Sequence, residues 1–415
     1  MKQSPASIDS AVDATRGDSR LSGYRPTFAA VDLGRLTANY RALAARVGED
    51  VGVIPVVKAD AYGHGAVAVA RRLSTLGPRA FAVALPEEGV ELRRAGISQE
   101  ILLLGALGPG QVGVALEHRL TPAIFERGLL ERLNHEGRAR GRRIDVNVKV
   151  DTGMGRIGFP TTEHGALVDW LASAQGIEVT GVFTTFARAD EPDDAATARQ
   201  IDHLGALLAG LARAGIGPGL VHAANTAGIL AHPPGWKQAV RPGLGLYGIH
   251  PGEAVPRAPL LPVLALETTV IQVKDVPAGT PIGYGGAWRA EGPARIATLP
   301  VGYGDGYPRA LGSRGRVLFD GGEGRVAGRV SMDLIAVDAT GIEGVAVGSP
   351  ATLIGERGGG SVTADEIARA CGTIPYETLC GISGRVPRVY VEAGRVLEVR
   401  PPATETSAVQ PGRDR

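Results

Sequence analysis

The sequence predicts an α/β protein, with an N-terminal (β/α)8 barrel of the TIM type and a C-terminal, mostly-β domain. Three observations support this prediction. Short apolar runs alternate with helix-length amphipathic segments over the first 250 residues. Four prolines then fall between Pro251 and Pro262, and β-branched runs punctuated by glycine follow them. We place the two domains at 25–255 and 256–400, on the two sides of this change in character; at roughly 100–200 residues per domain, a chain of 415 residues suggests two or three domains.

The predicted barrel strands recur at the spacing of β/α units. Helical periodicity, with apolar residues at i, i+3 and i+4, separates them in segments such as Ala66–Leu76, Pro86–Ala95, Glu163–Ser173 and Ala195–Ala214. The runs interpreted as strands are Thr27–Asp32, Val53–Lys58, Phe81–Ala84, Ile101–Leu104, Leu120–Ile124, Ile144–Val150, Glu178–Thr184, Val221–Ala224 and Gln238–Arg241. Without the first, eight strands over about 230 residues match a (β/α)8 barrel. A doubly wound sheet is the structural alternative.

The second domain is expected to contain strands and a single helix, Thr363–Cys371. Its predicted strands are Leu264–Val273, Arg295–Leu299, Arg316–Phe319, Val326–Val330, Leu334–Val337 and Arg395–Val399. The two ends of the chain, 1–24 and 401–415, are polar or lack apolar periodicity, so we expect a disordered arm and tail there.

Composition excludes several classes of protein. Lysine and arginine number 44 against 43 acidic residues, a balance unlike that of proteins that neutralise nucleic-acid phosphates. No run approaches the ~18 apolar residues of a membrane span, and Met1–Gly23 has no apolar signal core. The two cysteines, Cys371 and Cys380, predict neither a disulfide framework nor a metal site. We expect a cytoplasmic protein that binds no nucleic acid, membrane or metal.

Lysine is scarce, with only five in the chain, and two of the five lie in apolar runs, Lys58 and Lys149. A lysine at the mouth of a barrel loses solvation when it is charged, so its pKa should fall. A neutral amine is what an imine with an aldehyde cofactor requires. For Lys58 the alternative is a surface lysine whose stem lies along apolar side chains.

Polar residues follow several of the predicted strands, where the active sites of such barrels form. Asn225 and Thr226 follow Val221–Ala224, and Arg241 ends the last strand. The loops after strands seven and eight commonly bind phosphate in these barrels, so both segments fit a phosphate. The alternative for Thr226 is an ordinary helix cap.

Two GxGxxG segments are poor candidates for a dinucleotide site. In the first, 153–158, Asp151 lies just before the segment and Arg156 within it, where a dinucleotide turn presents bare backbone. The second, 243–248, leads into the proline-rich stretch and not into a helix. Tyr284 and Tyr303 lie among glycines, which allow backbone to approach a ligand, although each could equally be a turn tyrosine. Three histidines without metal spacing are interpreted as structural: His64, His222 and His250.

Several motifs together resemble the alanine racemases that depend on pyridoxal 5′-phosphate (PLP). The motifs are VVKADAYGHGA, KVDTGMGRIGF, HAANT, VRPGLGLYG, ATLPVGYGDGYPRAL, GRVSMD and TIPYETLCGISGRVPR, in family order from about Arg25 to Arg400. The resemblance implies a barrel plus a β domain, assembled as a head-to-tail homodimer with shared active sites. It also implies a small amino-acid substrate.

The resemblance assigns roles to individual residues. Lys58 matches the lysine that forms the imine with PLP and acts as one catalytic base, and Tyr284 of the partner subunit matches the second base. Lys149 matches a lysine that is often carbamylated. The residues that match cofactor contacts are Lys58, Tyr62, Arg156, Asn225, Thr226, Arg241, Gly243, Leu244 and Tyr376. Those that match substrate or entrance positions are Arg156, Met332, Tyr303 and Tyr307.

Elementary chemistry supports these assignments. Racemisation removes a Cα proton from one face and returns one to the other, which two opposed bases do better than one. An arginine at the ring nitrogen stays protonated and cannot readily give that nitrogen a proton, which disfavours side reactions such as transamination. As a carbamate, Lys149 would become an anion that can pair with Arg156.

Thr185 departs from the family pattern, which usually has histidine at this position of the THFA motif. We therefore expect altered support for Arg241 and lower activity. The leading interpretation is interconversion of L- and D-alanine, with D-alanine supplying peptidoglycan synthesis. The alternatives are a broad-specificity racemase, a related decarboxylase that would need an acid in place of Arg241, and a non-catalytic PLP homeostasis protein. The last would lack the β domain and Tyr284.

Overall fold

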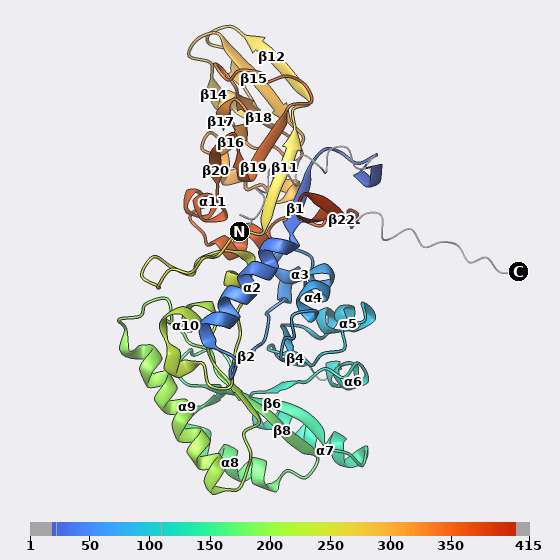
Figure 1. Ribbon diagram of the computed structural model, residues 1–415, viewed down its shortest axis with the longest axis vertical. Helices are drawn as coiled ribbons and strands as arrows, with labels where there is room; N and C mark the ends of the chain where they lie inside the picture. Colours follow the sequence, from blue (N-terminus) through green and yellow to red (C-terminus); the bar gives the residue numbers. More distant parts are fainter. Residues whose placement is uncertain (1–18, 22, 109, 404–415) are drawn as a thin grey trace, which may run out of the picture. The chain divides into compact units, whose positions relative to one another are not determined.

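A computed structural model describes residues 19–21, 23–108 and 110–403, and these form two compact units (Figure 1). The barrel unit comprises Thr37–Ala61 and Ala66–Leu261. The β unit comprises the described residues of Met1–Leu36, Tyr62–Gly65 and Pro262–Arg415. Of the ends predicted to be disordered, only 19–21, 23–24 and 401–403 fall within the described residues.

Short parallel strands form the centre of the barrel unit. They are β2 (Gly52–Val53), β3 (Phe81–Val83), β4 (Ile101–Leu103), β5 (Ala123–Ile124), β6 (Ile144–Asp151), β8 (Ile177–Phe183), β9 (Leu220–His222) and β10 (Ala239–Val240), with a small additional strand β7 (Phe159–Pro160) on β6. Six of them pair in the order β2-β10-β9-β8-β6-β5, and β3 pairs with β4. All of these pairings are parallel.

Two isolated bridges close these strands into a ring. Val56, just beyond β2, bridges Ala82 in β3, and Leu102 in β4 bridges Thr121, just before β5. The eight predicted strands therefore form a closed parallel barrel, which confirms the predicted fold class and excludes the open, doubly wound sheet. The carboxyl ends of the strands meet at one end of this barrel.

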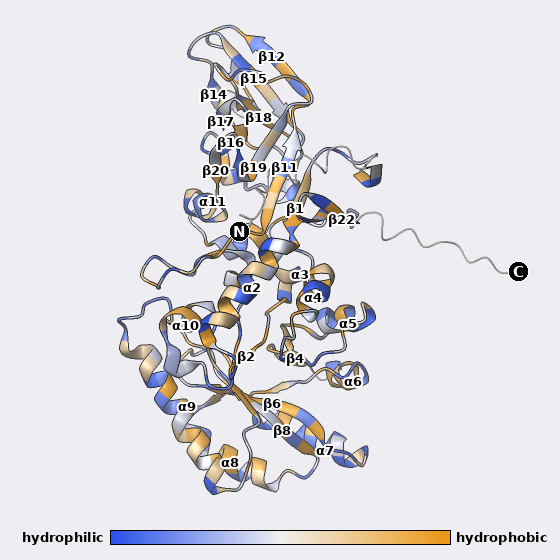
Figure 2. Ribbon diagram, in the orientation of Figure 1, coloured by the Kyte–Doolittle hydropathy of each residue, from blue (hydrophilic) through white to orange (hydrophobic). Residues whose placement is uncertain are grey.

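Helices surround the barrel, and in the longer ones Figure 2 shows apolar residues (orange) interspersed with polar residues (blue). They are α4 (Ala66–Ser74), α5 (Pro86–Arg94), α6 (Gln111–Glu117), α7 (Arg127–Ala139), α8 (His164–Ser173), α9 (Ala195–Arg213) and α10 (Thr226–Ala231), while α2 (Leu33–Val47) begins in the β unit. In α9, for example, Leu204, Leu207 and Leu211 recur at helical spacing and are all buried.

The β unit is built on one long mixed sheet. Its order is β12-β15-β18-β17-β16-β19-β11-β1-β21-β22, with β20 paired to β19. The strands are β1 (Phe28–Asp32), β11 (Leu264–Thr269), β12 (Gln272–Val276), β15 (Ala294–Leu299), β16 (Arg316–Phe319), β17 (Gly322–Val326), β18 (Ile335–Asp338), β19 (Pro350–Arg357), β20 (Gly360–Val362), β21 (Arg388–Glu392) and β22 (Arg395–Arg400), beside a separate pair, β13 (Pro281–Ile282) and β14 (Trp288–Arg289).

The structure corrects the sequence analysis at several places in this unit. Strand β1, which we grouped with the first domain, pairs with β11 and β21, and its Phe28 and Ala30 pack against Ala265 and Val389. A strand without alternating polar and apolar residues fits either a barrel or a sheet buried on both faces, so the pattern of β1 alone could not place it. The predicted strand Leu264–Val273 is divided into β11 and β12. The helix predicted at Thr363–Cys371 is α11 (Ala364–Cys371), and a second helix, α12 (Pro375–Cys380), was missed.

A buried arginine explains why the short segment Tyr62–Gly65 belongs to the β unit. Arg388 is 1% exposed, and its Nε donates to the carbonyl oxygen of Gly63 at 3.0 Å. Its other guanidinium nitrogens donate to the carbonyl oxygens of Ile382, Ser383 and Val386. The five N–H donors of a guanidinium can satisfy several buried carbonyls at once, so Arg388 joins this segment to β21 and to the loop that precedes it.

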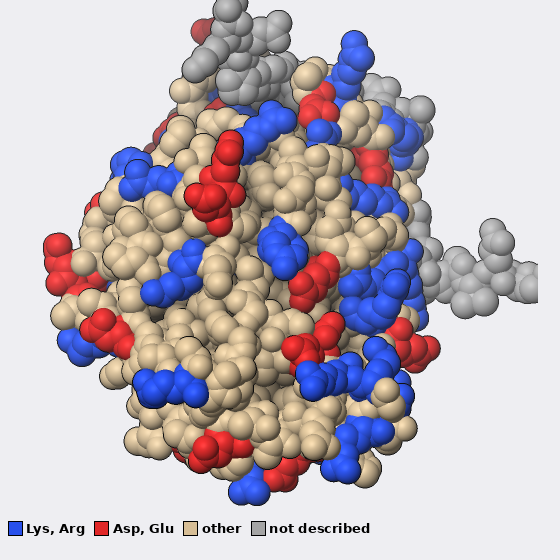
Figure 3. All heavy atoms as spheres, turned by 60° about the horizontal axis from the view of Figure 1, so that its bottom comes forward, with Lys and Arg blue, Asp and Glu red and all other residues tan. Residues whose placement is uncertain are grey.

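The surface carries both signs of charge. On the face shown in Figure 3, acidic and basic side chains are interspersed, with basic side chains more numerous along one side. Within the described part of the chain, no helix combines the length and apolarity that crossing a membrane would require.

Candidate active site

The sequence-predicted site residues of the barrel unit lie where its strands end. Lys149 is near the end of β6, Thr185 follows β8, Asn225 follows β9 and Arg241 follows β10. These strand ends meet at the same mouth of the barrel, and direct contacts between the side chains confirm the expected convergence.

Arg241 is held at this mouth by four hydrogen bonds. The side chain is 4% exposed, and its Nη1 donates to His222 Nδ1 at 2.6 Å and to the His222 carbonyl oxygen at 2.9 Å. Its Nη2 donates to the carbonyl oxygens of Thr184 and Ala223 at 2.7 and 3.1 Å. Burial lowers the pKa of Arg241 to about 9. Among the described residues Nε alone has no partner, so one N–H of a fixed guanidinium is left to donate to a ligand.

His222 is a site residue whose role the sequence analysis missed. It is fully buried, its ring stacks on Phe183 at 5.0 Å, and its Nε2 lies 3.2 Å from Asn147 Oδ1. Burial, with Arg241 and Lys149 nearby, holds the pKa of His222 well below its ordinary value. A neutral ring that donates from Nε2 and accepts at Nδ1 satisfies both neighbours. The motif HAANT contained this histidine, but only the fold brings it to Arg241.

Lys149 is buried in a cationic environment. It is 4% exposed, its Nζ donates to Thr185 Oγ1 at 2.9 Å, and it lies 4.8 Å from the centre of the Phe183 ring. Burial, followed by the charges of Arg241 and Arg156, lowers its pKa to about 7, against a smaller opposing effect of Asp151. The amine is therefore largely neutral slightly above neutral pH.

Thr185 contacts Lys149 and makes no hydrogen bond to Arg241. Its carbonyl oxygen accepts from Gln200 Nε2 at 3.0 Å, and Gln200 also accepts the N–H of Ala187 and donates to Thr152. Arg241 is held in place by its four hydrogen bonds to Thr184, His222 and Ala223. The lower activity expected from threonine at this position stays a prediction.

The loop between β6 and β7 presents Arg156 to solvent. Asp151 Oδ1 accepts the backbone N–H groups of Gly153, Met154 and Gly155, which lowers its pKa although burial acts in the opposite direction. Arg156 is exposed and makes no hydrogen bond or ion pair with another described residue. This loop leads into β7 and a short turn before α8, so it is not the strand–turn–helix of a dinucleotide site.

Thr226 joins the two loops predicted to bind phosphate. Its Oγ1 accepts the backbone N–H groups of Gly243 and Gly245, at 3.2 and 3.1 Å, which leaves its own hydroxyl proton to donate. Asn225 caps α10, accepting the N–H of Gly228 at 3.0 Å. A Cβ at Gly245 would come within 2.7 Å of Thr226 Cγ2, so only glycine allows this close approach.

Lys58 was predicted to end a strand. It instead begins the turn labelled α3 (Lys58–Tyr62). Strand β2 ends at Val53, and Ala59, Asp60 and Ala61 have φ values of 51°, 53° and 54°. This is the left-handed region, which residues other than glycine rarely adopt. Lys58 is half-buried at the start of this turn.

The remaining predicted site residues belong to the β unit. Tyr62 and Tyr376 form a tilted ring pair with centroids 5.7 Å apart, and burial, followed by Tyr376 and Cys380, raises the pKa of Tyr62. Three others are accessible: Tyr284 is 70%, Met332 51% and Tyr303 43% exposed. Tyr307, expected at the substrate entrance, is buried within the β unit at 1% exposure, and its role at the entrance stays a prediction.

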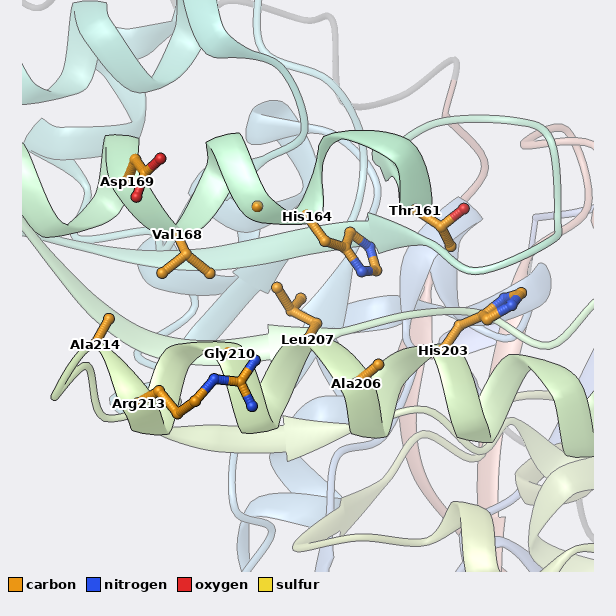
Figure 4. A pocket seen from close by; sticks show the side chains of 11 residues that line it. Thr161, His164, Val168, Asp169, His203, Ala206, Leu207, Gly210, Arg213 and Ala214 are labelled. Atoms are coloured by element: carbon orange, nitrogen blue, oxygen red, sulfur yellow. The ribbon is translucent and has the colours of Figure 1, made fainter.

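A hollow lies between α8 and α9, away from the residues described above (Figure 4). His164, Asp169, His203 and Arg213 line it together with small and apolar residues. It contains none of the residues that the sequence analysis predicted, and His203 instead hydrogen-bonds to the backbone of Thr152. The barrel mouth is therefore the stronger candidate.

Two family models together match nearly all of the folded chain. The model described as alanine racemase, N-terminal domain, matches residues 31–251, and that described as alanine racemase, C-terminal domain, matches residues 263–390. This chain belongs to the alanine racemase family. It is thus an isomerase of the family that the sequence motifs indicated.

Relatives in sequence and structure agree with this family. The alanine racemase of Symbiobacterium thermophilum is 46% identical over 89% of this chain and 98% of its own length. That of Halothermothrix orenii is 42% identical over 88% and 97%. A solved alanine racemase from Clostridium difficile 630 superposes with a TM-score of 0.87 at 35% identity, covering 91% of this chain and 99% of its own.

Alanine racemases depend on PLP, and the barrel mouth fits this cofactor. A solved alanine racemase from Bartonella henselae, 28% identical with a TM-score of 0.81 over 88% of this chain and 99% of its own, carries covalently bound pyridoxal phosphate. In this chain Lys58 offers an amine, and Arg241 Nε, which has no partner among the described residues, offers a donor for a ring nitrogen. Thr226 offers a hydroxyl proton beside a glycine cradle for phosphate. The donor set therefore matches an aldehyde, a pyridine nitrogen and a phosphate.

Proposed function

We propose that this chain interconverts L-alanine and D-alanine with PLP and supplies D-alanine for peptidoglycan in the cytoplasm. The observation that carries this proposal is Arg241, a guanidinium fixed by four hydrogen bonds with Nε left to meet a ring nitrogen. PLP, when bound, acidifies the substrate Cα–H, because the negative charge left on Cα by loss of the proton spreads into the cofactor ring. An arginine that keeps its proton limits that spreading, which favours return of the proton to Cα.

The proposed cofactor contacts divide into three groups. Lys58 binds the aldehyde carbon and Arg241 contacts the ring nitrogen, with Arg156 near the cofactor's phenolic oxygen. The phosphate contacts are Asn225, Thr226, Gly243, Leu244, Tyr62 and Tyr376. The phosphate assignment is supported by the hydroxyl proton of Thr226 and by the close approach of the Gly245 backbone to that side chain. The assignment of the two tyrosines comes from the family resemblance.

We assign the two bases to Lys58 and to Tyr284 of the partner subunit, in a head-to-tail homodimer. The exposure of Tyr284, 70%, leaves its phenol available to a second copy. Met332 and Tyr303, also exposed, are proposed to face the substrate together with Arg156. In this arrangement Lys58 and the partner's Tyr284 each hold or release a proton on opposite faces of Cα.

The direct test is formation of D-alanine from L-alanine by the purified protein with PLP, and the reverse. Because enantiomers have equal free energies, both reactions are expected to stop at about a 1:1 mixture. PLP alone is the control. A bound cofactor without interconversion of any amino acid would favour the homeostasis alternative, and similar kcat/KM values for several amino acids would favour the broad-specificity alternative.

We further propose that CO2 adds to the neutral amine of Lys149, forming a carbamate and releasing a proton. The low pKa of Lys149 and the nearby Arg156, which has no partner among the described residues, support this modification. The carbamate would pair with Arg156 and replace a cation by an anion.

Stability measurements on Lys149→Met test this proposal. In bicarbonate-free buffer the buried ammonium destabilises the native state below about pH 7, and the penalty disappears as pH rises toward the unfolded pKa. The variant should therefore melt higher than wild type at pH 6, with a smaller difference at pH 9. Added bicarbonate at pH 8 should stabilise wild type but not Lys149→Met. Exposed Lys274→Met is the control, and equal bicarbonate responses in all three proteins would contradict the carbamate.

A further inference from the structure

The turn that begins at Lys58 is conformationally strained. Ala59, Asp60 and Ala61 follow one another in the left-handed region, with φ/ψ of 51°/52°, 53°/45° and 54°/49°, and Tyr62 continues it with φ 54°. Residues with a Cβ adopt this region at a cost, and such runs persist only where the surroundings hold them. The turn therefore needs specific contacts to keep it in place.

One carboxylate on a neighbouring helix supplies the contact next to Lys58. Glu88 lies in the first turn of α5, and its Oε1 accepts the backbone N–H of Ala59 at 2.6 Å. Its Oε2 accepts the N–H groups of Ala84 and Leu85, at 2.7 and 3.0 Å. One side chain thus joins the residue after Lys58 to the end of β3 and the start of α5.

Other hydrogen bonds hold the rest of the turn, but none of those described here involves the backbone N–H of Ala59. Asp60 Oδ1 accepts the N–H of Ala66 at 2.8 Å, and the N–H of Ala61 donates to the carbonyl oxygen of Val57 at 2.9 Å. Glu88 alone contacts the backbone N–H of Ala59 through a side chain, among the hydrogen bonds of the described residues. No lysine or arginine pairs with Glu88 within that part of the chain, so its oxygens serve backbone N–H groups.

We propose that Glu88 is a positioning residue, whose carboxylate holds the left-handed turn and thereby fixes the Lys58 amine where it binds the cofactor. This rests on the proposed function, in that Lys58 is taken as the cofactor lysine. Carboxylate-to-backbone hydrogen bonds are stronger than neutral ones, so a neutral amide at this position should hold the turn less well. Its NH2 group would also face backbone N–H groups, which cannot accept.

The first experiment compares Glu88→Gln with Glu87→Gln in the full-length, PLP-loaded enzyme. Glu87 is the matched control, because it is the adjacent exposed carboxylate and bonds only Gln111 in the described chain. Cofactor loss on dilution, followed by visible absorbance, should be roughly 10–100-fold faster in Glu88→Gln, corresponding to loss of a charged hydrogen bond. Amide exchange in the peptide that contains Ala59 should also be faster. Glu87→Gln should match wild type in both measurements.

A glycine rescue separates positioning of Lys58 from general stability. Glycine adopts the left-handed region without strain, so Ala59→Gly should restore most of the cofactor retention that Glu88→Gln loses. Ala393→Gly is the matched control, because Ala393 is also exposed, has a φ of 48°, and lies in the turn between β21 and β22. It should not restore retention, although it relieves the same kind of strain.

The outcomes distinguish this inference from the proposed function. Equal cofactor loss and amide exchange in Glu88→Gln and wild type would overturn the inference, as would rescue by Ala393→Gly equal to that by Ala59→Gly. If instead Lys58→Ala retained PLP with the same absorbance as wild type, the proposed function would fail. The exchange rate at Ala59 would still report whether Glu88 holds the turn.

Discussion

Replacing Lys58 with alanine is expected to abolish racemisation, lowering kcat by at least ~10³-fold, because one side chain supplies both the cofactor bond and a catalytic base. The visible absorbance of the bound cofactor should disappear as well. Folding should be unaffected, since Lys58 is a half-buried residue in a turn and not part of the core. Absorbance, melting temperature and D-alanine formation check the three parts of this result.

Mixing two inactive variants extends this result to the proposed dimer. Tyr284→Phe should also be inactive in both directions, because its phenol proton is lost and an equilibrium constant of 1 requires equal kcat/KM values for the two directions. If each site takes Lys58 from one chain and Tyr284 from the other, every mixed dimer regains one intact site. Random re-association should then restore about a quarter of wild-type activity. Each variant mixed with itself is the control, and no recovery in the mixture would contradict a shared site.

Replacing Arg241 with glutamate is expected to change the reaction as well as slow it. A buried carboxyl with a raised pKa can donate a proton to the ring nitrogen, which Arg241 does not readily do. Racemisation should fall by at least ~10²-fold, and transamination, with pyruvate as product, should become detectable. Pyruvate formation measured against D-alanine formation gives the ratio of the two reactions.

Arg241→Gln separates this chemical effect from structural damage. Both substitutions leave the carbonyl oxygens of Thr184, His222 and Ala223 without their donor, at about 1–3 kcal/mol for each buried group left unsatisfied. Both should therefore melt lower than wild type by similar amounts. Only the glutamate variant should produce pyruvate, and equal pyruvate from both would contradict a role of Arg241 in withholding a proton.

The sequence predicted the barrel well because its strands are short, buried and separated by amphipathic helices. The predicted run Ile144–Val150 corresponds to β6 and Glu178–Thr184 to β8, with ends differing by one residue. The β unit was harder, since its strands pair across long stretches of chain and α12 is too short to show helical periodicity. The burial of Tyr307 could not be predicted either, because its assignment to the substrate entrance came from the family resemblance and not from a pattern in the chain.

By itself, the sequence determined the family, the cofactor and the residues at the strand ends, because motifs and apolar periodicity are local properties of the chain. Only the tertiary structure decided that β1 belongs to the β unit, that His222 holds Arg241, and that Thr185 meets Lys149. It also decided the left-handed turn after Lys58 and its contact with Glu88. Each of these depends on which distant residues meet, because burial and hydrogen-bond partners are set by packing and not by local pattern.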